Sequence, residues 1–287
     1  MSKGAERWLV ETEWLASHLD TPGLVILDGS MHLPTTKRDA RAEYLAAHIP
    51  GALFFDIDDI ADEKSSLPHM LPSSTKFASR MKRMGVGDGM HVIAYDSEGL
   101  YSAARVWWMF RAMGHDQAQI LNGGLKKWKA EGRTLEDGPP RRRTERHFTA
   151  RLNAGLVRDV GDVKALIGSK TAQIVDARAA NRFEGTVPEP RQGLRSGHIP
   201  GSRNVPFASL LNPDGTLKTA TELGAIFAKA GVDTAKPVVA SCGSGVTAGV
   251  IALALAILGR PDAAVYDGSW TEWGGDPALP IETGPAP

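Results

Sequence analysis

The chain contains an internal repeat, which restricts its possible folds more than any other feature of the sequence. Four short landmarks occur twice, in the same order and at a nearly constant offset. These pairs are Leu27-Asp28 and Val175-Asp176, His48–Gly51 and His198–Gly201, Val92–Ala94 and Val238–Ala240, and Trp128 and Trp273, at offsets of 148, 150, 146 and 145 residues. A shared offset of this kind indicates two copies of one domain. A length of 287 residues is suited to two such domains.

Between the two copies lies a stretch rich in proline and arginine, Gly138–Arg146. Its prolines and its lack of an apolar period favour an exposed connection rather than a helix or strand. A basic run can also mark a nucleic-acid patch, but one short run in a neutral protein favours a solvated connector. We therefore predict a first domain at 1–138, a linker at 139–154 and a second domain at 155–287.

Within each copy, short apolar runs alternate with helical patterns. The runs carry little polar alternation, which is typical of parallel strands buried on both faces. Predicted strands are 24–28, 52–55, 91–95, 119–121, 173–176, 203–205, 237–241 and 263–266, and predicted helices are 76–84, 102–113, 220–230 and 247–258. This order predicts an α/β fold of two tandem domains, each an open parallel sheet with helices on both faces. Ligands of such sheets bind beyond the carboxyl ends of the strands, here after Tyr95 and Ser241.

Composition excludes several classes of function. Lys plus Arg and Asp plus Glu both number 33, which argues against a nucleic-acid-binding protein. The longest apolar run, 246–258, is shorter than the roughly 20 residues of a membrane span. Residues 1–14 contain no apolar run, and a single cysteine excludes an intrachain disulfide, so we expect a soluble cytoplasmic protein. No metal-ligand spacing or nucleotide-binding glycine pattern is present, and we expect no metal and no cofactor.

The one cysteine, Cys242, lies where chemistry is expected. It ends an apolar strand and is followed by a loop with Gly243 and Gly245, after which a helix begins. Such a loop can curl its N–H groups inward into an anion-binding nest, and the helix N-terminus adds partial positive charge. A thiolate or persulfide at Cys242 would be stabilised there. The alternative is a buried structural cysteine. A cysteine-dependent phosphatase is disfavoured because Ala248 stands where such enzymes need an arginine.

The segment Cys242–Ala248 resembles the active-site loop of the 3-mercaptopyruvate sulfurtransferases, within the rhodanese family. Further matching segments are Asp39–Gly51, Gly99–Phe110, Arg182–Arg191 and Tyr266–Trp273. Rhodaneses proper carry basic residues at the second and third loop positions, where this chain has Gly243 and Ser244. The resemblance implies two rhodanese-like domains, with the reaction confined to the second.

The resemblance also implies an activity. Sulfur would pass from 3-mercaptopyruvate to Cys242 as a persulfide, with release of pyruvate, and then to a thiol acceptor such as thioredoxin, or to cyanide. Two alternatives remain open at this point. One is a thiosulfate sulfurtransferase, and the other is a rhodanese-like module that binds sulfur without catalysis. Asp96 stands opposite Cys242 in the repeat, which suggests that the first copy has lost the reaction.

Roles for individual residues follow from the same resemblance. Arg182 and Arg191 would hold the carboxylate and ketone of the substrate, since guanidinium groups bind carboxylates bidentately. The loop residues Gly243, Gly245, Val246 and Thr247 would contact the substrate.

A relay of Ser244, His48 and Asp39 would move a proton, with histidine acting near neutrality. Two of these assignments have structural alternatives. His48 recurs as His198 and can equally belong to a structural turn, and Asp39 can cap a helix. Five tryptophans that are at helical spacing or recur in the repeat are predicted to be packing residues: Trp107, Trp108, Trp128, Trp270 and Trp273.

Overall fold

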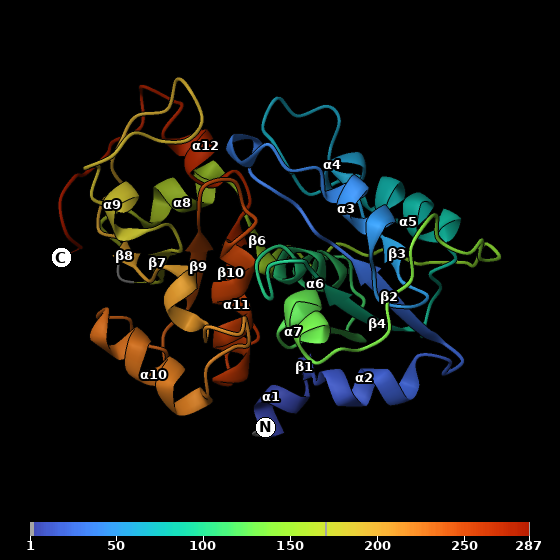
Figure 1. The fold of residues 1–287 in the computed structure, drawn as a ribbon. Helices are drawn as coiled ribbons and strands as arrows, with labels where there is room; N and C mark the ends of the chain where they lie inside the picture. Colours follow the sequence, from blue (N-terminus) through green and yellow to red (C-terminus); the bar gives the residue numbers. More distant parts are fainter. Residues whose placement is uncertain (1–2, 170, 287) are drawn as a thin grey trace.

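Two five-stranded parallel sheets form the centre of the molecule (Figure 1). The computed structural model describes residues 3–169 and 171–286. The strand order is β1-β5-β4-β2-β3 in the first sheet and β6-β10-β9-β7-β8 in the second, so the two domains share one topology. Their strands are β1 Leu9–Val10, β2 Leu24–Asp28, β3 Leu53–Phe54, β4 His91–Tyr95, β5 Ala118–Leu121, β6 Val157–Arg158, β7 Gln173–Asp176, β8 Arg203–Asn204, β9 Val238–Ser241 and β10 Ala264–Tyr266.

The predicted fold is confirmed, and all eight predicted strands are present with ends that differ by at most one residue. Two strands were not predicted. β1 and β6 contain two residues each and lie at the edges of the sheets, where β1 pairs with β5 and β6 with β10. Their sequences are too short to show a period, so their strand conformation comes from pairing.

Helices cover both faces of each sheet. Along β2, Val25 and Leu27 point into the core cluster that contains α6, while Leu24 and Ile26 point into a second cluster that contains Trp128 of α7. The helices are α1 Lys3–Glu6, α2 Thr12–His18, α3 Ala40–Ala46, α4 Ile57–Ile60, α5 Ser74–Arg83, α6 Ala103–Ala112, α7 Gly124–Ala130, α8 Val160–Leu166, α9 Ala180–Phe183, α10 Ala220–Lys229, α11 Ala248–Ile257 and α12 Ser269–Trp273. Short 3₁₀ turns are η1 Pro34–Thr36, η2 Ala154–Leu156 and η3 Phe207–Leu210.

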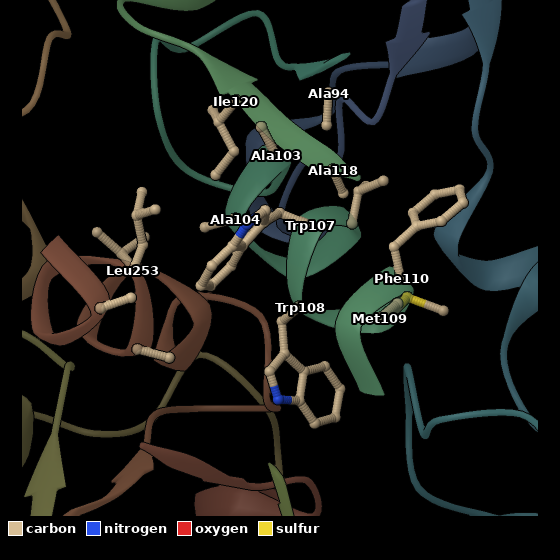
Figure 2. Close-up of a cluster of buried hydrophobic side chains, with 14 of the residues drawn as sticks. Ala94, Ala103, Ala104, Trp107, Trp108, Met109, Phe110, Ala118, Ile120 and Leu253 are labelled. Carbon is tan, nitrogen blue, oxygen red and sulfur yellow. The ribbon is translucent and has the colours of Figure 1, made fainter. Parts of the chain in front are cut away.

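The two domains meet through α6 of the first and α11 of the second, and one hydrophobic core runs through both. Figure 2 shows Leu253 of α11 beside Ala104 and Trp107 of α6. The backbones approach closely, because a Cβ on Gly249 would lie 2.8 Å from the Ala104 carbonyl oxygen. The five tryptophans are at most 1% exposed, which confirms that they are packing residues. No described helix is long and apolar enough to cross a bilayer.

The segment between the domains is bound to the first domain along part of its length. Phe148 is 4% exposed and packs in the core, and the backbone N–H of Arg151 donates to the Met113 carbonyl at 2.9 Å. The arginines at 141 and 142 are exposed, as expected of a connector. No helix or strand lies between Ala130 and Ala154 in this described stretch. The boundaries at 138 and 154 stay predictions.

Candidate active site

Cys242 directly follows β9, the central strand of the second sheet, and α11 begins six residues later. Its backbone N–H donates to the Ser269 hydroxyl at 3.1 Å, which fixes the start of the loop. The side chain is only 1% exposed, so the sulfur is covered by its surroundings rather than open to solvent. Thr247 is the N-cap residue of α11, but its side chain makes no capping hydrogen bond.

The carbonyl groups at the start of the Cys242 loop are turned outward. The carbonyl of Cys242 accepts from the Trp270 N–H at 3.0 Å, and that of Gly243 accepts from the Thr271 N–H at 2.8 Å and its hydroxyl at 2.7 Å. In a trans peptide the N–H points opposite the carbonyl, so the next N–H groups point away from α12. Within the described chain, the N–H groups of residues 243–247 make no hydrogen bond. This loop, including Ser244 and Val246, therefore offers a row of unpaired donors.

The equivalent loop of the first domain shows what such donors bind. Asp96 follows β4 as Cys242 follows β9, and its buried carboxylate accepts four backbone hydrogen bonds. The donors are the N–H groups of Glu98, Gly99, Tyr101 and Ala103, at 2.9, 3.0, 2.7 and 2.8 Å. Burial raises the pKa of Asp96, and these hydrogen bonds offset part of that rise. The anion-binding loop of the first domain is thus filled by the Asp96 carboxylate. The corresponding loop of the second domain carries the Cys242 sulfur instead.

Two guanidinium groups lie over the second loop. A Cβ built on Gly243 would lie 3.1 Å from Arg182 Nη2 and 4.0 Å from Arg191 Nη1. Arg182 is held by Glu189, whose Oε2 is 2.5 Å from Nη2. The structure therefore brings Arg182 and Arg191 to the Cys242 loop, where a substrate carboxylate could bind.

A histidine that sequence reasoning missed also reaches this site. Nη2 of Arg191 donates to Nε2 of His69 at 3.2 Å, and Nδ1 of His69 lies 2.5 Å from Asp58 Oδ1. Because an arginine can only donate, the proton of this imidazole is on Nδ1 and points at Asp58. This hydrogen bond lowers the pKa of Asp58. His69 has a φ of +62°, an uncommon conformation outside glycine.

The structure does not bring His48 to the Cys242 loop. Its Nδ1 donates to the Tyr44 carbonyl at 2.8 Å, its ring stacks on Tyr44, and its backbone pairs with Glu136. His198 has the matching set of contacts with Phe183 and Glu282 in the second domain. The shared environment of His48 and His198 supports the structural turn, which is the alternative given above, over a relay role for His48.

Asp39 also has a structural contact of its own. It is the N-cap of α3, where its carboxylate accepts from the Ala42 N–H at 3.0 Å. Its described contacts include no residue of the Cys242 loop. The capping role considered above therefore accounts for this residue.

Tyr101 of the first domain also lies close to the site. Burial, together with the nearby Cys242, raises the pKa of its hydroxyl to about 12, while Arg191 and Arg182 act in the opposite direction. Its ring meets Phe207 of the second domain edge-on at 5.5 Å. Among the described residues, no group of three or more His, Cys, Asp or Glu side chains is placed to hold a metal ion.

Comparisons with known proteins agree with this geometry. The Rhodanese-like domain matches residues 11–131 and 159–276. A 3-mercaptopyruvate sulfurtransferase of Escherichia coli is 48% identical over 96% of this chain and 98% of its own. A thiosulfate sulfurtransferase of Bos taurus is 46% identical over 93% and 92%. The crystal structure of the E. coli 3-mercaptopyruvate enzyme SseA superposes with a TM-score of 0.84 at 46% identity, covering 92% and 98% of the two chains. The chain belongs to the rhodanese family and carries two copies of its domain.

Proposed function

We propose that the protein is a sulfurtransferase that moves sulfur from 3-mercaptopyruvate to a thiol acceptor through a persulfide on Cys242. The observation that supports this proposal most is the row of unpaired N–H groups at 243–247, with Arg182 and Arg191 above it. Backbone donors of this kind stabilise an anionic sulfur, and the guanidinium groups bind a carboxylate beside it. The E. coli relative named for the same reaction supports the choice.

The charges around the site favour a donor with one negative charge. Arg178 pairs with Asp176 at 2.7 Å and with Glu189 at 2.9 Å, and Glu189 pairs also with Arg182. These two cations and two anions cancel. Arg191 makes no direct ion pair among the described residues, and Asp58, which attracts it through space, lies beyond the His69 ring, so the Arg191 guanidinium remains available to a substrate carboxylate. Mercaptopyruvate carries one carboxylate, whereas thiosulfate is a dianion and the loop itself has no cation.

In the first half-reaction the Cys242 thiolate attacks the sulfur of mercaptopyruvate. An S–S bond forms, the C–S bond breaks, and its electron pair becomes the enolate of pyruvate. The proton of the substrate thiol is then transferred to the enolate carbon. The persulfide anion that remains is stabilised by the N–H groups of the loop.

We assign the proton transfer to His69, with Asp58 as the group that orients it. The Asp58 contact fixes the tautomer, which leaves Nε2 as the basic nitrogen facing the site. Ser244 keeps its proposed place in the relay because it is in the loop, 5% exposed, and its hydroxyl has no hydrogen bond within the described chain. Gly243, Gly245, Val246 and Thr247 are proposed to contact the substrate through their backbone.

In the second half-reaction a thiol acceptor attacks the outer sulfur and regenerates the Cys242 thiolate. Reduced thioredoxin, a small thiol or cyanide would serve, which gives ping-pong kinetics. We place the protein in the cytoplasm, since its single cysteine is free and its fold needs no disulfide.

Steady-state kinetics with mercaptopyruvate and thiosulfate, measured side by side, test this function. We expect a large preference for mercaptopyruvate, and a preference for thiosulfate would favour the activity named for the bovine relative. Cys242→Ser should lower pyruvate formation at least about 1,000-fold, because it removes the nucleophile. Incubation with donor should add about 32 Da, one sulfur, to the wild type alone. Pyruvate formation by the serine variant, or an unmodified wild type, would refute the proposal.

A further inference from the structure

A buried arginine of the first domain reaches the Cys242 loop of the second. Arg105 lies in the first turn of α6 and is 0% exposed. Its Nη1 is 2.5 Å from Asp267 Oδ1 and 3.2 Å from the Gly245 carbonyl oxygen, and its Nη2 donates to the His69 carbonyl. The other carboxylate oxygen of Asp267 accepts from the Leu71 N–H at 2.6 Å. One ion pair therefore touches both loops that form the site.

From this geometry we infer that Arg105 is a positioning residue, which holds the Cys242 loop and the His69 loop in their reactive arrangement across the domain interface. The inference deepens the proposed function and rests on it. It adds a positioning role to the first domain, which also supplies His69 and Asp58, although its own loop carries Asp96 in place of a cysteine.

The first step of the argument concerns the peptide between Gly245 and Val246. Its carbonyl is held by Arg105, and all peptide bonds of the described chain are trans. The N–H of Val246 lies in the same peptide plane and points in the opposite direction, away from Arg105. Gly245 has a φ of +78°, so without this contact the peptide could rotate and carry its N–H out of the nest.

The second step concerns the histidine. The hydrogen bond from Arg105 fixes the backbone of His69, whose ring bridges Asp58 and Arg191. The adjacent contact between Asp267 and Leu71 fixes the same loop two residues later. Loss of Arg105 would thus release the histidine and the row of N–H groups together.

The third step concerns what fixes Arg105. Its guanidinium lies 4.5 Å above the Trp108 ring. The turn that starts α6 is anchored by Asp96, which accepts from the N–H of Ala103, two residues before Arg105. These contacts hold the buried guanidinium in place, because moving it away from Asp267 would leave two buried charges unpaired.

Four variants and a matched control test the inference. Arg105→Met removes the contacts and leaves Asp267 unpaired, and Arg105→Lys keeps the charge but not the three-way geometry. Arg105→Met with Asp267→Asn removes both charges, so its folding should recover relative to the single Arg105→Met variant. Asp267→Asn alone completes the cycle. The control is Arg111→Met on the same helix, a residue 7% exposed that also lies over tryptophan rings but bonds to Pro261.

Two measurements are made at a temperature where every variant is folded. The first is hydrogen–deuterium exchange, which needs no activity, of peptides covering 268–272 and 67–71; the first contains the Trp270 and Thr271 N–H groups that bond to the Cys242 loop, and the second contains the Leu71 N–H that bonds to Asp267. We expect exchange at least about tenfold faster in both peptides for Arg105→Met and the double variant, and no change for Arg111→Met. The second is steady-state turnover of mercaptopyruvate. We expect kcat to fall about 10- to 100-fold in those two variants with KM within about threefold, and Arg105→Lys to lie between them and the wild type.

Several results would overturn the inference. The most direct is a double variant that recovers its stability and also has wild-type kcat, since Arg105 would then be purely structural. An unchanged exchange rate in Arg105→Met would lead to the same conclusion. So would a fall in kcat in Arg111→Met as large as that in Arg105→Met. An inactive wild type would instead reject the proposed function, and the exchange measurement would still decide whether Arg105 holds the two loops.

Discussion

Replacing Gly245 by alanine tests how tightly the Cys242 loop is constrained. Gly245 has a φ of +78°, and an added Cβ would lie 2.6 Å from the Asp267 carbonyl oxygen and 3.1 Å from Arg105 Nη1. A left-handed conformation costs an alanine roughly 1–2 kcal/mol. The overlap with a backbone oxygen adds about 1–3 kcal/mol, the usual range for overpacking. We therefore expect Gly245→Ala to lower the free energy of unfolding by about 2–5 kcal/mol.

A second glycine separates the two contributions. Gly259, just after α11, has a φ of +86° but no atom within 4 Å of an added Cβ. Gly259→Ala should therefore show only the backbone cost, roughly 1–2 kcal/mol. Urea unfolding of both variants gives the comparison, provided that their m values agree.

A third glycine tests the substrate arginines in the same loop. Gly243 does not have a positive φ, and its added Cβ would meet the flexible end of Arg182 at 3.1 Å. Gly243→Ala should therefore change stability little but raise KM for the donor, because it displaces the guanidinium.

Equal destabilisation by Gly245→Ala and Gly259→Ala would refute the reasoning about the Cys242 loop. It would mean that the backbone at Asp267 moves aside without cost to admit the added Cβ.

Two further predictions concern buried or paired carboxylates. Asp96→Ala leaves four N–H groups without their acceptor, so the free energy of unfolding, measured by thermal unfolding, should fall by on the order of 3 kcal/mol or more. A fall below about 1 kcal/mol would show that the Asp96 loop needs no anion. The pKa of Asp58 is lowered mainly by its hydrogen bond from His69. The ionised Asp58 carboxylate therefore stabilises the folded protein at a pH above the pKa that Asp58 has in the unfolded chain. This stabilisation is lost as the pH falls through the lower pKa of Asp58 in the folded protein. Asp58→Asn should therefore reduce the stability difference between about pH 6 and about pH 3 in urea unfolding. An unchanged difference would contradict the assigned pair.

The central strands could be predicted from the sequence because burial on both faces leaves an uninterrupted apolar run, as in β2 and β4. The Cys242 loop could be predicted for a related reason, since strand, glycines and helix are consecutive in the chain. The edge strands β1 and β6 could not, because two residues carry no period and, unlike the equally short β3 and β8, neither of them follows a repeated landmark of the sequence.

His69 could not be found from local pattern. It lies in a segment without helix or strand, and Arg191, its partner in the site, is 122 residues away in sequence. One signal was available, since His48 has a repeat counterpart in His198 and His69 has none among the repeated landmarks. In a duplicated protein with one reactive copy, a histidine outside the repeat is the better candidate for chemistry.

The complete burial of α11 has a consequence for the independence of the two domains. All ten residues from Ala248 to Ile257 are buried, because α6 covers the face that a lone domain would turn toward water. Without the first domain, the second domain would expose this apolar face to water and would tend to aggregate through it. The second domain, which carries Cys242, therefore depends on the first for the burial of α11 as well as for the side chains of His69 and Asp58.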